Sequence, residues 1–250
     1  MKVKNILVSQ PKPVDIEKSP YADIIKKHNV NIEFRKFFKI EGIEARDLRK
    51  ERLQILDHTA IILTSRTAVD HLFRLAKEMR VEMPDTMKYF CISEATALYL
   101  QKYVTYRKRK IFHSQQTFTQ LLDLILKHKD ETFLFPCSSE HDEQPNALLT
   151  EHKINFRKAI IYKTVPDLIK NDIDIKKYEL IVFFSPIGIR SLLVNWPDYV
   201  KNGQFLGAYG QTTAAALKEA GLELSVTAPS PATPSMTMAI DQFLQKNNKK

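Results

Sequence analysis

Short apolar runs alternate with amphipathic stretches along most of the chain. The runs 60–64 and 180–184 are apolar except for Thr64 at the end of the first, which is typical of strands buried on both faces of a sheet. The stretches that follow them, 67–79 and 187–196, place apolar residues three and four positions apart, which predicts helices with one buried face. Strands that alternate with helices of this length indicate an α/β protein with parallel sheets.

The same pattern predicts elements over the whole chain. We expect strands at 5–9, 32–40, 60–64, 88–92, 109–112, 132–136, 154–164, 180–184, 205–209 and 223–227. We expect helices at 20–29, 45–56, 67–79, 95–103, 117–128, 144–152, 187–196, 212–220 and 234–245. Two of the strands, 32–40 and 154–164, are long and rich in charge, which suits a connection between domains.

The chain contains an internal repeat. A shift of 120 positions places Ser65 on Ser185, and it superposes the apolar faces of the two helices that follow. Further along, Thr96 falls on Thr213, with a small drift in the offset that short loop deletions would cause. A period this long indicates the duplication of a whole sub-domain and not a solenoid.

The duplication predicts two similar α/β domains. The first strand and helix have no partner nearby, so we expect them to complete the C-terminal domain. This gives a discontinuous domain of 1–33 and 165–250, an inserted domain of 41–153, and a two-stranded linker of 34–40 and 154–164. Ligands of open parallel sheets bind beyond the carboxyl ends of the strands, so we expect the site in the cleft between the domains.

Composition narrows the class of protein. Of 250 residues, 44% are hydrophobic and 27% are charged, which is typical of a water-soluble globular chain. We find no apolar run long enough for a membrane span and no secretory signal, so we expect a cytoplasmic protein. The two cysteines, Cys91 and Cys137, lie in apolar strands and form no metal-binding motif, which favours reduced, buried thiols.

The net charge of +9 favours an anionic partner. One segment, YVTYRKRKIF at 103–112, interleaves basic and aromatic residues, as some nucleic-acid-binding surfaces do. The same residues also suit an edge strand that lysine and arginine protect from mispairing. With six glycines, the chain has neither a dinucleotide-binding nor a phosphate-loop motif, so nothing predicts a nucleotide cofactor.

Hydroxyl and glycine residues gather where predicted strands end. Helix N-termini and backbone N–H groups there can bind anions without many charged side chains. These candidate binding residues are Thr64, Ser65, Arg66, Ser93, Thr96, Ser185, Gly188, Gly210, Thr212 and Thr213. Alternative interpretations are helix N-caps for Thr96, Thr212 and Thr213, turns for Ser65 and Ser185, and an exposed position for Arg66.

The ordered set of motifs resembles the uroporphyrinogen-III synthase family over essentially the whole chain. The matching stretches are AIILTSRTAVDHLF, SEATALYL, KAIIYKTV, IVFFSPIGIRSLL and AYGQTTAAALKEAGLELSVTAPSPATPSMTMAIDQFL. The resemblance implies two flavodoxin-like domains on a β-ladder linker. It also implies an enzyme of haem biosynthesis, without metal or cofactor, that cyclises hydroxymethylbilane with inversion of the last pyrrole ring, giving uroporphyrinogen III and water.

The resemblance further implies a small-molecule partner with eight carboxylates, no nucleic acid, no membrane and a monomer. It points to Tyr162 in AIIYKT as the general acid for the departing hydroxyl, because a phenol is protonated at neutral pH and can donate. Tyr162 could instead be a packed aromatic at the hinge between the domains.

Several positions depart from the family pattern. The first strand ends in Ser9-Gln10-Pro11 without the usual arginine, Ile187 replaces a polar residue, and Glu94 follows Ser93. The segment FPCSSEHDE at 135–143 is acidic. These changes favour an alternative function, a non-catalytic protein of the same fold that binds a tetrapyrrole or another polyanion as a sensor or regulator.

Overall fold

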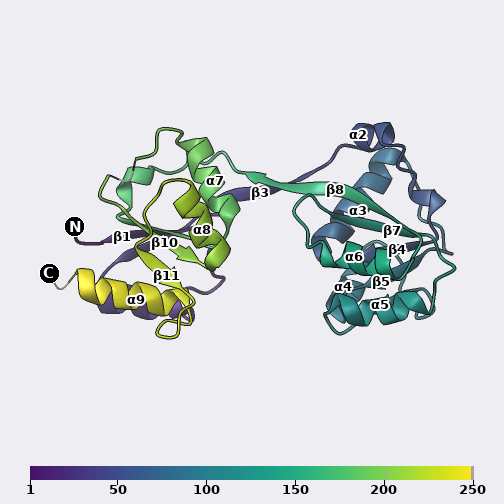
Figure 1. The fold of residues 1–250 in the computed structure, drawn as a ribbon, viewed down its shortest axis with the longest axis horizontal. Coiled ribbons are helices and arrows are strands. Elements are labelled where there is room, and N and C mark those ends of the chain that lie inside the picture. The colour runs from purple at the N-terminus through teal and green to yellow at the C-terminus, as the bar shows by residue number, and fades with distance from the viewer. Residues whose placement is uncertain (201, 249–250) are drawn as a thin grey trace. The chain divides into compact units, whose positions relative to one another are not determined.

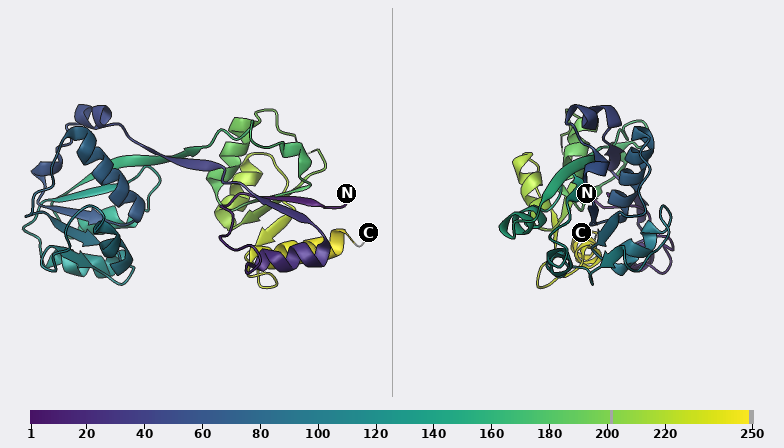
Figure 2. Two further views of the ribbon diagram at one scale, coloured as in Figure 1. Left: turned by 180° about the vertical axis from the view of Figure 1, so that it is seen from behind. Right: turned by 90° about the vertical axis from the view of Figure 1, so that its right-hand side faces the viewer.

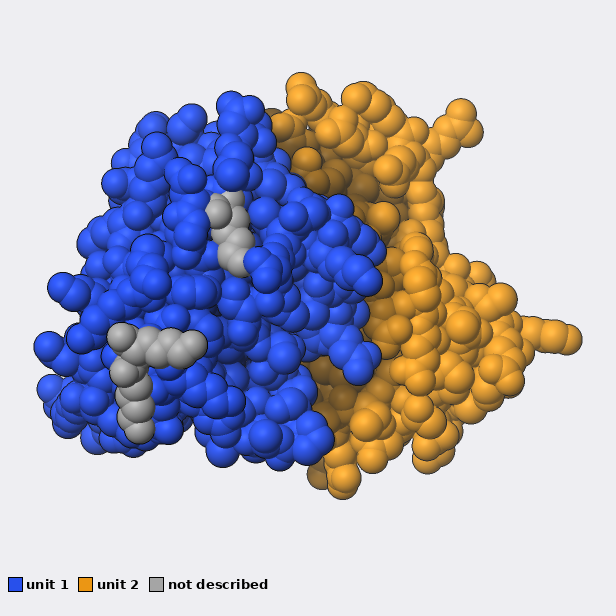
Figure 3. Space-filling view, turned by 60° about the vertical axis from the view of Figure 1, so that its left-hand side comes forward, with its two compact units in different colours: residues 1–39, 165–250 blue, residues 40–164 orange. Residues whose placement is uncertain are grey.

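The computed structural model describes residues 1–200 and 202–248. The chain divides into two compact units, one made of residues 1–39 and 165–250 and the other of residues 40–164 (Figure 3). We call them unit 1 and unit 2. Each unit has its own sheet and its own hydrophobic core.

The described residues of unit 1 form a five-stranded sheet in the order β11-β10-β9-β1-β2, in which all neighbouring strands are parallel (Figure 1). Its strands are β1 (Asn5–Val8), β2 (Asn31–Phe34), β9 (Leu180–Phe183), β10 (Phe205–Tyr209) and β11 (Val226–Ala228). Its helices are α1 (Pro20–His28), α7 (Pro186–Asn195), α8 (Gln211–Glu219) and α9 (Met236–Asn247), with a 3₁₀ turn, η2 (Ile175–Lys177).

The six-stranded sheet that the described residues form in unit 2 has the order β3-β8-β7-β4-β5-β6, parallel from β8 to β6. Its strands are β3 (Phe38–Gly42), β4 (Ala60–Leu63), β5 (Lys88–Cys91), β6 (Ile111–His113), β7 (Phe133–Ser138) and β8 (Phe156–Pro166). Its helices are α2 (Ala45–Lys50), α3 (Arg66–Met79), α4 (Glu94–Leu100), α5 (Phe118–Leu126) and α6 (Gln144–Glu151), with a 3₁₀ turn, η1 (Ile55–Asp57).

The two sheets share one spatial plan. In each sheet, three strands that follow one another in the chain lie in that order from the middle of the sheet to one edge. They are β9-β10-β11 in unit 1 and β4-β5-β6 in unit 2. On the other side of β9 stand β1 and β2, and on the other side of β4 stand β7 and β8. Numbered within its unit, the sheet of unit 1 has the flavodoxin order 2-1-3-4-5. The sheet of unit 2 has the same spatial plan, but β7 and β8 follow β4–β6 in the chain, whereas β1 and β2 precede β9–β11. The predicted parallel α/β fold is confirmed.

Helices cover both faces of each sheet. In unit 2, α3 and α4 pack over one face with residues such as Leu72, and α5 and α6 pack over the other with residues such as Leu121. In unit 1, α7 packs with α8, and α1 packs beside α9 (Figure 2). The innermost strands β4 and β9 are buried along their whole length, as their continuous apolar runs predict. None of the described helices is both long enough and apolar enough to cross a bilayer.

The prediction of one strand over 32–40 is wrong. The segment forms two strands, and they belong to different sheets: β2 pairs with β1 in unit 1, and β3 lies beside β8. Between them, Phe37 is fully buried against Phe183, with ring centroids 5.7 Å apart. Arg35 forms an ion pair with Asp172. The strand-like sequence pattern runs unbroken through 32–40, but the residues before Phe37 pair within one sheet and the residues after it lie in the other.

One helix boundary differs from the expected one, and the two strands expected as a linker are neighbours. The helix expected over 45–56 ends at Lys50, because Arg52 adopts a left-handed backbone (φ 54°) and its carbonyl accepts a hydrogen bond from Arg157. The strands expected as a two-stranded linker, at 34–40 and 154–164, lie beside each other as β3 and β8 in the six-stranded sheet. β8 is paired to β7 along much of its length.

Candidate active site

Across the sheet of unit 2, the chain progresses in one direction from β4 and in the other direction from β7. In unit 1 it does the same from β9 and β1. At such a point the connections leave the two neighbouring strands in opposite directions, and ligands of parallel sheets bind beyond the carboxyl ends of these strands. Thr64 and Ser65 directly follow β4, and Ser185 follows β9 shortly after its last residue. The repeat-related serines therefore occupy the position at which each sheet is expected to bind a ligand.

Tyr162 and Ser65 come together in unit 2. Tyr162 lies on β8, where its side chain is buried, and its hydroxyl lies 3.3 Å from the Ser65 hydroxyl. Burial raises the pKa of Tyr162, while the hydrogen bond with Ser65 acts in the opposite direction. The phenol is therefore protonated at neutral pH and can donate a proton or a hydrogen bond.

Three candidate residues of unit 2 take part in helix capping. The Ser65 hydroxyl accepts from the Ala68 N–H at 3.0 Å and caps α3. The Ser93 hydroxyl accepts from the Thr96 N–H at 3.2 Å and caps α4. The Thr96 side chain is buried, and its hydroxyl lies 3.1 Å from that of Ser93. The expectation that Thr96 is an N-cap residue is therefore wrong, because Ser93 caps α4. Ser65, for which a turn was the alternative, caps α3 and stays within reach of Tyr162.

The candidate residues of unit 1 lie at the starts of α7 and α8. Ser185 is the N-cap residue of α7, but its side chain makes no cap hydrogen bond. Gly188 lets the start of α7 approach the sheet, since a Cβ there would lie 3.2 Å from the Phe183 ring. Gly210, with φ 84°, precedes α8, which begins with Gln211. In the first turn of α8, the Thr212 side chain is exposed and the Thr213 side chain is buried, and neither is the N-cap residue that the sequence suggested.

Arg66, the first residue of α3, is exposed. Its guanidinium lies over the Tyr99 ring, 5.4 Å from the centroid. The Tyr99 hydroxyl donates to the Asp70 carboxylate at 2.9 Å, which fixes the ring under the arginine. An aromatic surface therefore holds the arginine near the carboxyl end of β4.

A hollow lies at the carboxyl end of the unit 2 sheet. It has a volume of about 500 Å³, within the range of small-molecule sites, and it includes Thr64 and Ile92, which follow β4 and β5. His141 also lines it, and its ring is fixed by the Ser138 carbonyl, 2.9 Å from Nδ1. Thr64 is thus a candidate binding residue that borders a cavity within its own unit.

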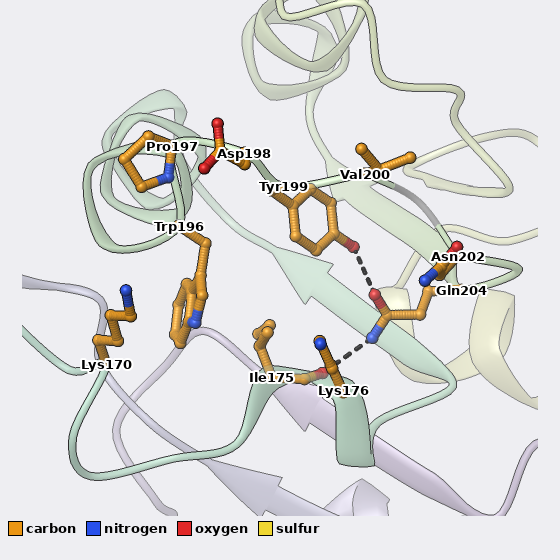
Figure 4. A pocket seen from close by; sticks show the side chains of 10 residues that line it. All are labelled: Lys170, Ile175, Lys176, Trp196, Pro197, Asp198, Tyr199, Val200, Asn202 and Gln204. Atoms are coloured by element: carbon orange, nitrogen blue, oxygen red, sulfur yellow. Dashed lines mark hydrogen bonds between the residues drawn. The ribbon is translucent and has the colours of Figure 1, made fainter.

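A larger cavity of about 590 Å³ lies in unit 1, away from every residue that the sequence singled out (Figure 4). Its lining includes Trp196 and Tyr199 from the loop after α7, and Ile175 and Lys176 from η2. η2 precedes β9, and the loop precedes β10. The cavity therefore lies at the amino ends of these strands, opposite the edge where parallel sheets bind ligands.

The acidic segment at 135–143 is partly neutralised within unit 2. The Lys158 ammonium lies 3.4 Å from the Glu143 carboxylate. The pKa of Glu143 is lowered, chiefly by its hydrogen bond from Asn146 and then by Lys158. The carboxylate is thus ionised at neutral pH, but it faces a cation, so the segment is less repulsive to an anion than its sequence alone implies.

The two thiols are buried and free. Burial raises the pKa of Cys91 to about 12 and that of Cys137 to about 11. Thiolates are the nucleophilic and metal-binding form, so neither thiol is activated for such chemistry at neutral pH. The prediction of buried, reduced cysteines agrees with this environment.

The basic run at 103–112 lies mostly before the edge strand β6 and not within it. Arg107 forms an ion pair with Asp85 at 2.9 Å, and Lys110 donates to the Thr86 carbonyl at 3.2 Å. These contacts tie the segment to the loop before β5. Two cationic side chains of the run thus help to hold the segment in place near the edge of the sheet.

Sequence reasoning missed His71. It lies on α3, and its ring stacks on that of Tyr162 with centroids 5.0 Å apart and planes inclined by 18°. Nothing in the sequence marks it, since it occupies an ordinary position on an amphipathic helix. Only the packing of α3 against β8 brings the two rings together.

Comparison with known proteins bears on the family and the fold of the chain. The model of the family described as uroporphyrinogen-III synthase HemD matches residues 19–238. Uroporphyrinogen-III synthetase from Helicobacter pylori 26695 is similar in structure, with a TM-score of 0.56 and 18% identity over 97% of this chain and 99% of that one. A mutant uroporphyrinogen III synthase from Thermus thermophilus gives a TM-score of 0.48 and 13% identity over 97% and 99% of the two chains. No curated protein matches the chain.

Proposed function

This chain belongs to the uroporphyrinogen-III synthase family of porphyrin biosynthesis, and on that premise we propose that it is a cyclising hydro-lyase. Its substrate is hydroxymethylbilane, a linear tetrapyrrole, and its products are uroporphyrinogen III and water. The ring closes with inversion of the last pyrrole. The observation that carries the proposal is the family match over residues 19–238.

The substrate's eight carboxylates bind where parallel strands end and helices begin. In unit 2 these positions are supplied by Thr64, Ser65, Arg66, Ser93 and Thr96. In unit 1 they are supplied by Ser185, Gly188, Gly210, Thr212 and Thr213. Backbone N–H groups at the first turns of α3, α7 and α8 point their partial positive charge at such anions. The net charge of +9 also favours the approach of a polyanion.

Tyr162 acts as the general acid. The reaction begins when the hydroxymethyl group loses its oxygen as water, and a donor near this oxygen lowers the barrier. The Tyr162 phenol is protonated at neutral pH, because burial raises its pKa. Its hydroxyl is already held 3.3 Å from the Ser65 hydroxyl, so the proton donor has a defined position.

The site then directs ring closure by positioning. The carbocation left when water departs is attacked by the substituted carbon of the last pyrrole, so the linear chain must be folded back on itself. The bond from that carbon to its old methylene bridge then breaks, and the methylene carbocation bonds to the free α carbon of the same pyrrole. The proton lost from this carbon returns to the Tyr162 phenolate. Fixed carboxylate contacts achieve this by removing conformational freedom before the bond forms. This chemistry needs no redox step, and in the family it proceeds without a cofactor.

The direct test is a coupled assay. Hydroxymethylbilane is generated in situ, the protein is added, and the oxidised porphyrin isomers are separated by chromatography. We expect isomer III in excess over isomer I, which forms spontaneously. Isomer I alone, from a sample with native far-UV circular dichroism, would refute the synthase and favour a tetrapyrrole-binding protein of the same fold.

Tyr162→Phe tests the residue assignment. General acid catalysis contributes roughly 10²- to 10⁴-fold, so we expect kcat to fall at least about 100-fold. The variant loses one weak hydrogen bond, so its free energy of unfolding should change by no more than about 1 kcal/mol. Unchanged turnover would remove Tyr162 from this role without affecting the assignment of the reaction.

We also propose that the protein works as a monomer in the cytoplasm and binds neither nucleic acid nor membrane. The buried thiols suit a reducing compartment. Light scattering during size-exclusion chromatography should give the mass of one chain, 29.0 kDa. A mass twice as large over a range of protein concentrations would contradict the monomer.

A further inference from the structure

Two residues hold Tyr162 in place, one at the N-cap of α3 and one within that helix. At the start of α3, the Ser65 hydroxyl lies 3.3 Å from the phenol oxygen. Further along α3, the His71 ring stacks on the phenol ring, with centroids 5.0 Å apart and an angle of 18° between the planes. The hydrogen bond fixes the end of the side chain, and the stack fixes the plane of the ring.

His71 is itself held by Arg74. The Arg74 Nε–H donates to His71 Nδ1 at 3.2 Å. Another nitrogen of the guanidinium donates to the Ile43 carbonyl at 2.8 Å and to the Ile161 carbonyl at 3.4 Å. Ile161 precedes Tyr162 on β8. The arginine therefore ties the imidazole to the same strand that carries the phenol.

Gly42 leaves the space that Arg74 occupies. A Cβ at this position would lie 2.6 Å from the guanidinium carbon, closer than side-chain carbons approach one another. On its outer side, Arg74 forms an ion pair with Glu78. The guanidinium is thus fixed by backbone carbonyls, a carboxylate and the imidazole at once.

The imidazole is neutral at working pH. Nδ1 accepts a hydrogen bond from a cation, so it cannot carry a proton without breaking that bond. Burial and then Arg74 lower the pKa of His71, while Asp70 and Glu78 oppose them. The Asp70 carboxylate is already engaged by the Tyr99 hydroxyl. The group that faces His71 from β8 is the uncharged Tyr162.

We infer that His71 is a positioning residue for Tyr162, a neutral ring that Arg74 fixes and that in turn fixes the orientation of the phenol. The inference rests on the proposed role of Tyr162 as proton donor. Without the stack, the ring can swing about the Cα–Cβ bond of Tyr162 and carry the hydroxyl away from the donor position. A displacement of about 1 Å at a reacting group can cost roughly 100-fold in rate.

The first experiment compares two variants in the porphyrin-isomer assay. His71→Ala removes the ring and should lower kcat about tenfold, with KM changed less than about twofold, since a partial loss of position costs less than the roughly 100-fold of a full displacement. His71→Phe keeps a flat ring and should recover most of this loss. His113→Ala, at an exposed position on β6, is the matched control and should behave as wild type. Far-UV circular dichroism shows that each variant is folded.

A double variant tests whether His71 acts through Tyr162. In a Tyr162→Phe background, His71→Ala should cause no further fall in kcat. An equal fall in both backgrounds would overturn the inference, because His71 would then act on something else. Equal loss of activity in His71→Ala and His71→Phe would overturn it too, because the ring stack would not be what matters.

A spectroscopic readout is independent of activity. In wild type, the Tyr162 ring protons should be shifted upfield by the stacked imidazole, and ¹⁵N spectra should show His71 with its proton on Nε2 at neutral pH. His71→Ala should remove the shift. If the stack is present but kcat of His71→Ala equals that of wild type, only this inference fails. If Tyr162→Phe also retains full activity, the proposed acid fails with it.

Discussion

Ser65 and Ser185 occupy equivalent positions of the internal repeat, yet the structure gives them different bonds. Both are N-cap residues with nearly the same backbone angles, φ −160° in each case. The Ser65 hydroxyl accepts from the Ala68 N–H at 3.0 Å, whereas Ser185 makes no cap hydrogen bond. Removing the two hydroxyls should therefore have different effects on stability.

Ser65→Ala removes one cap, which costs about 1 kcal/mol of unfolding free energy. With an m-value of about 2 kcal/mol/M in urea, the unfolding midpoint should fall by about 0.5 M. Ser185→Ala should leave the midpoint unchanged within error. Far-UV circular dichroism reports the unfolding of both variants. Fluorescence of Trp196, the one tryptophan of the chain and the C-cap residue of α7, reports on the helix that Ser185 begins.

Activity should respond to both substitutions, whereas stability should respond to Ser65→Ala alone. If both hydroxyls bind substrate, kcat/KM falls in both variants, and Ser185→Ala loses activity without losing stability. A stability loss in Ser185→Ala equal to that in Ser65→Ala would refute the reasoning, because it would show that both serines cap their helices. Wild-type kcat/KM in Ser185→Ala would remove this residue from the proposed site.

Two further predictions concern unit 1. The buried Asn195 side chain accepts hydrogen bonds from the backbone N–H groups of residues 169 and 170, at 2.7 and 3.0 Å. Asn195→Ala should lower the free energy of unfolding by about 3 kcal/mol, because these donors lose their partner. Urea unfolding measures the loss, and Asn202→Ala at an exposed position is the control. The pKa of the Glu33 carboxyl is lowered, first by its hydrogen bond from Lys177. Its contribution to the free energy of unfolding is therefore present above the unfolded pKa of about 4.3 and is lost as pH falls through the folded pKa. Urea midpoints measured well above and well below that unfolded pKa should therefore differ less in Glu33→Gln than in wild type, and an equal difference would contradict the assignment.

The repeating pattern of apolar residues determined much of the fold. Continuous apolar runs such as 60–63 and 180–184 became the buried inner strands β4 and β9, because a strand covered on both faces has no polar side. The superposition of Ser65 on Ser185 anticipated that both serines follow an innermost strand. Local patterning suffices here because strand and helix periods are properties of short segments.

The pattern could not identify the partners of each segment. The continuous run at 32–40 became two strands in different sheets, because Phe37 is buried in the core of unit 1 while β3 lies beside β8 in unit 2. It could not show that Ser65 meets Tyr162 or that His71 stacks on the same ring, since these residues are far apart in the chain. The sequence by itself determined the elements, their repetition and the family resemblance. Only the tertiary structure decided which side chains meet, because that depends on long-range strand pairing and helix packing.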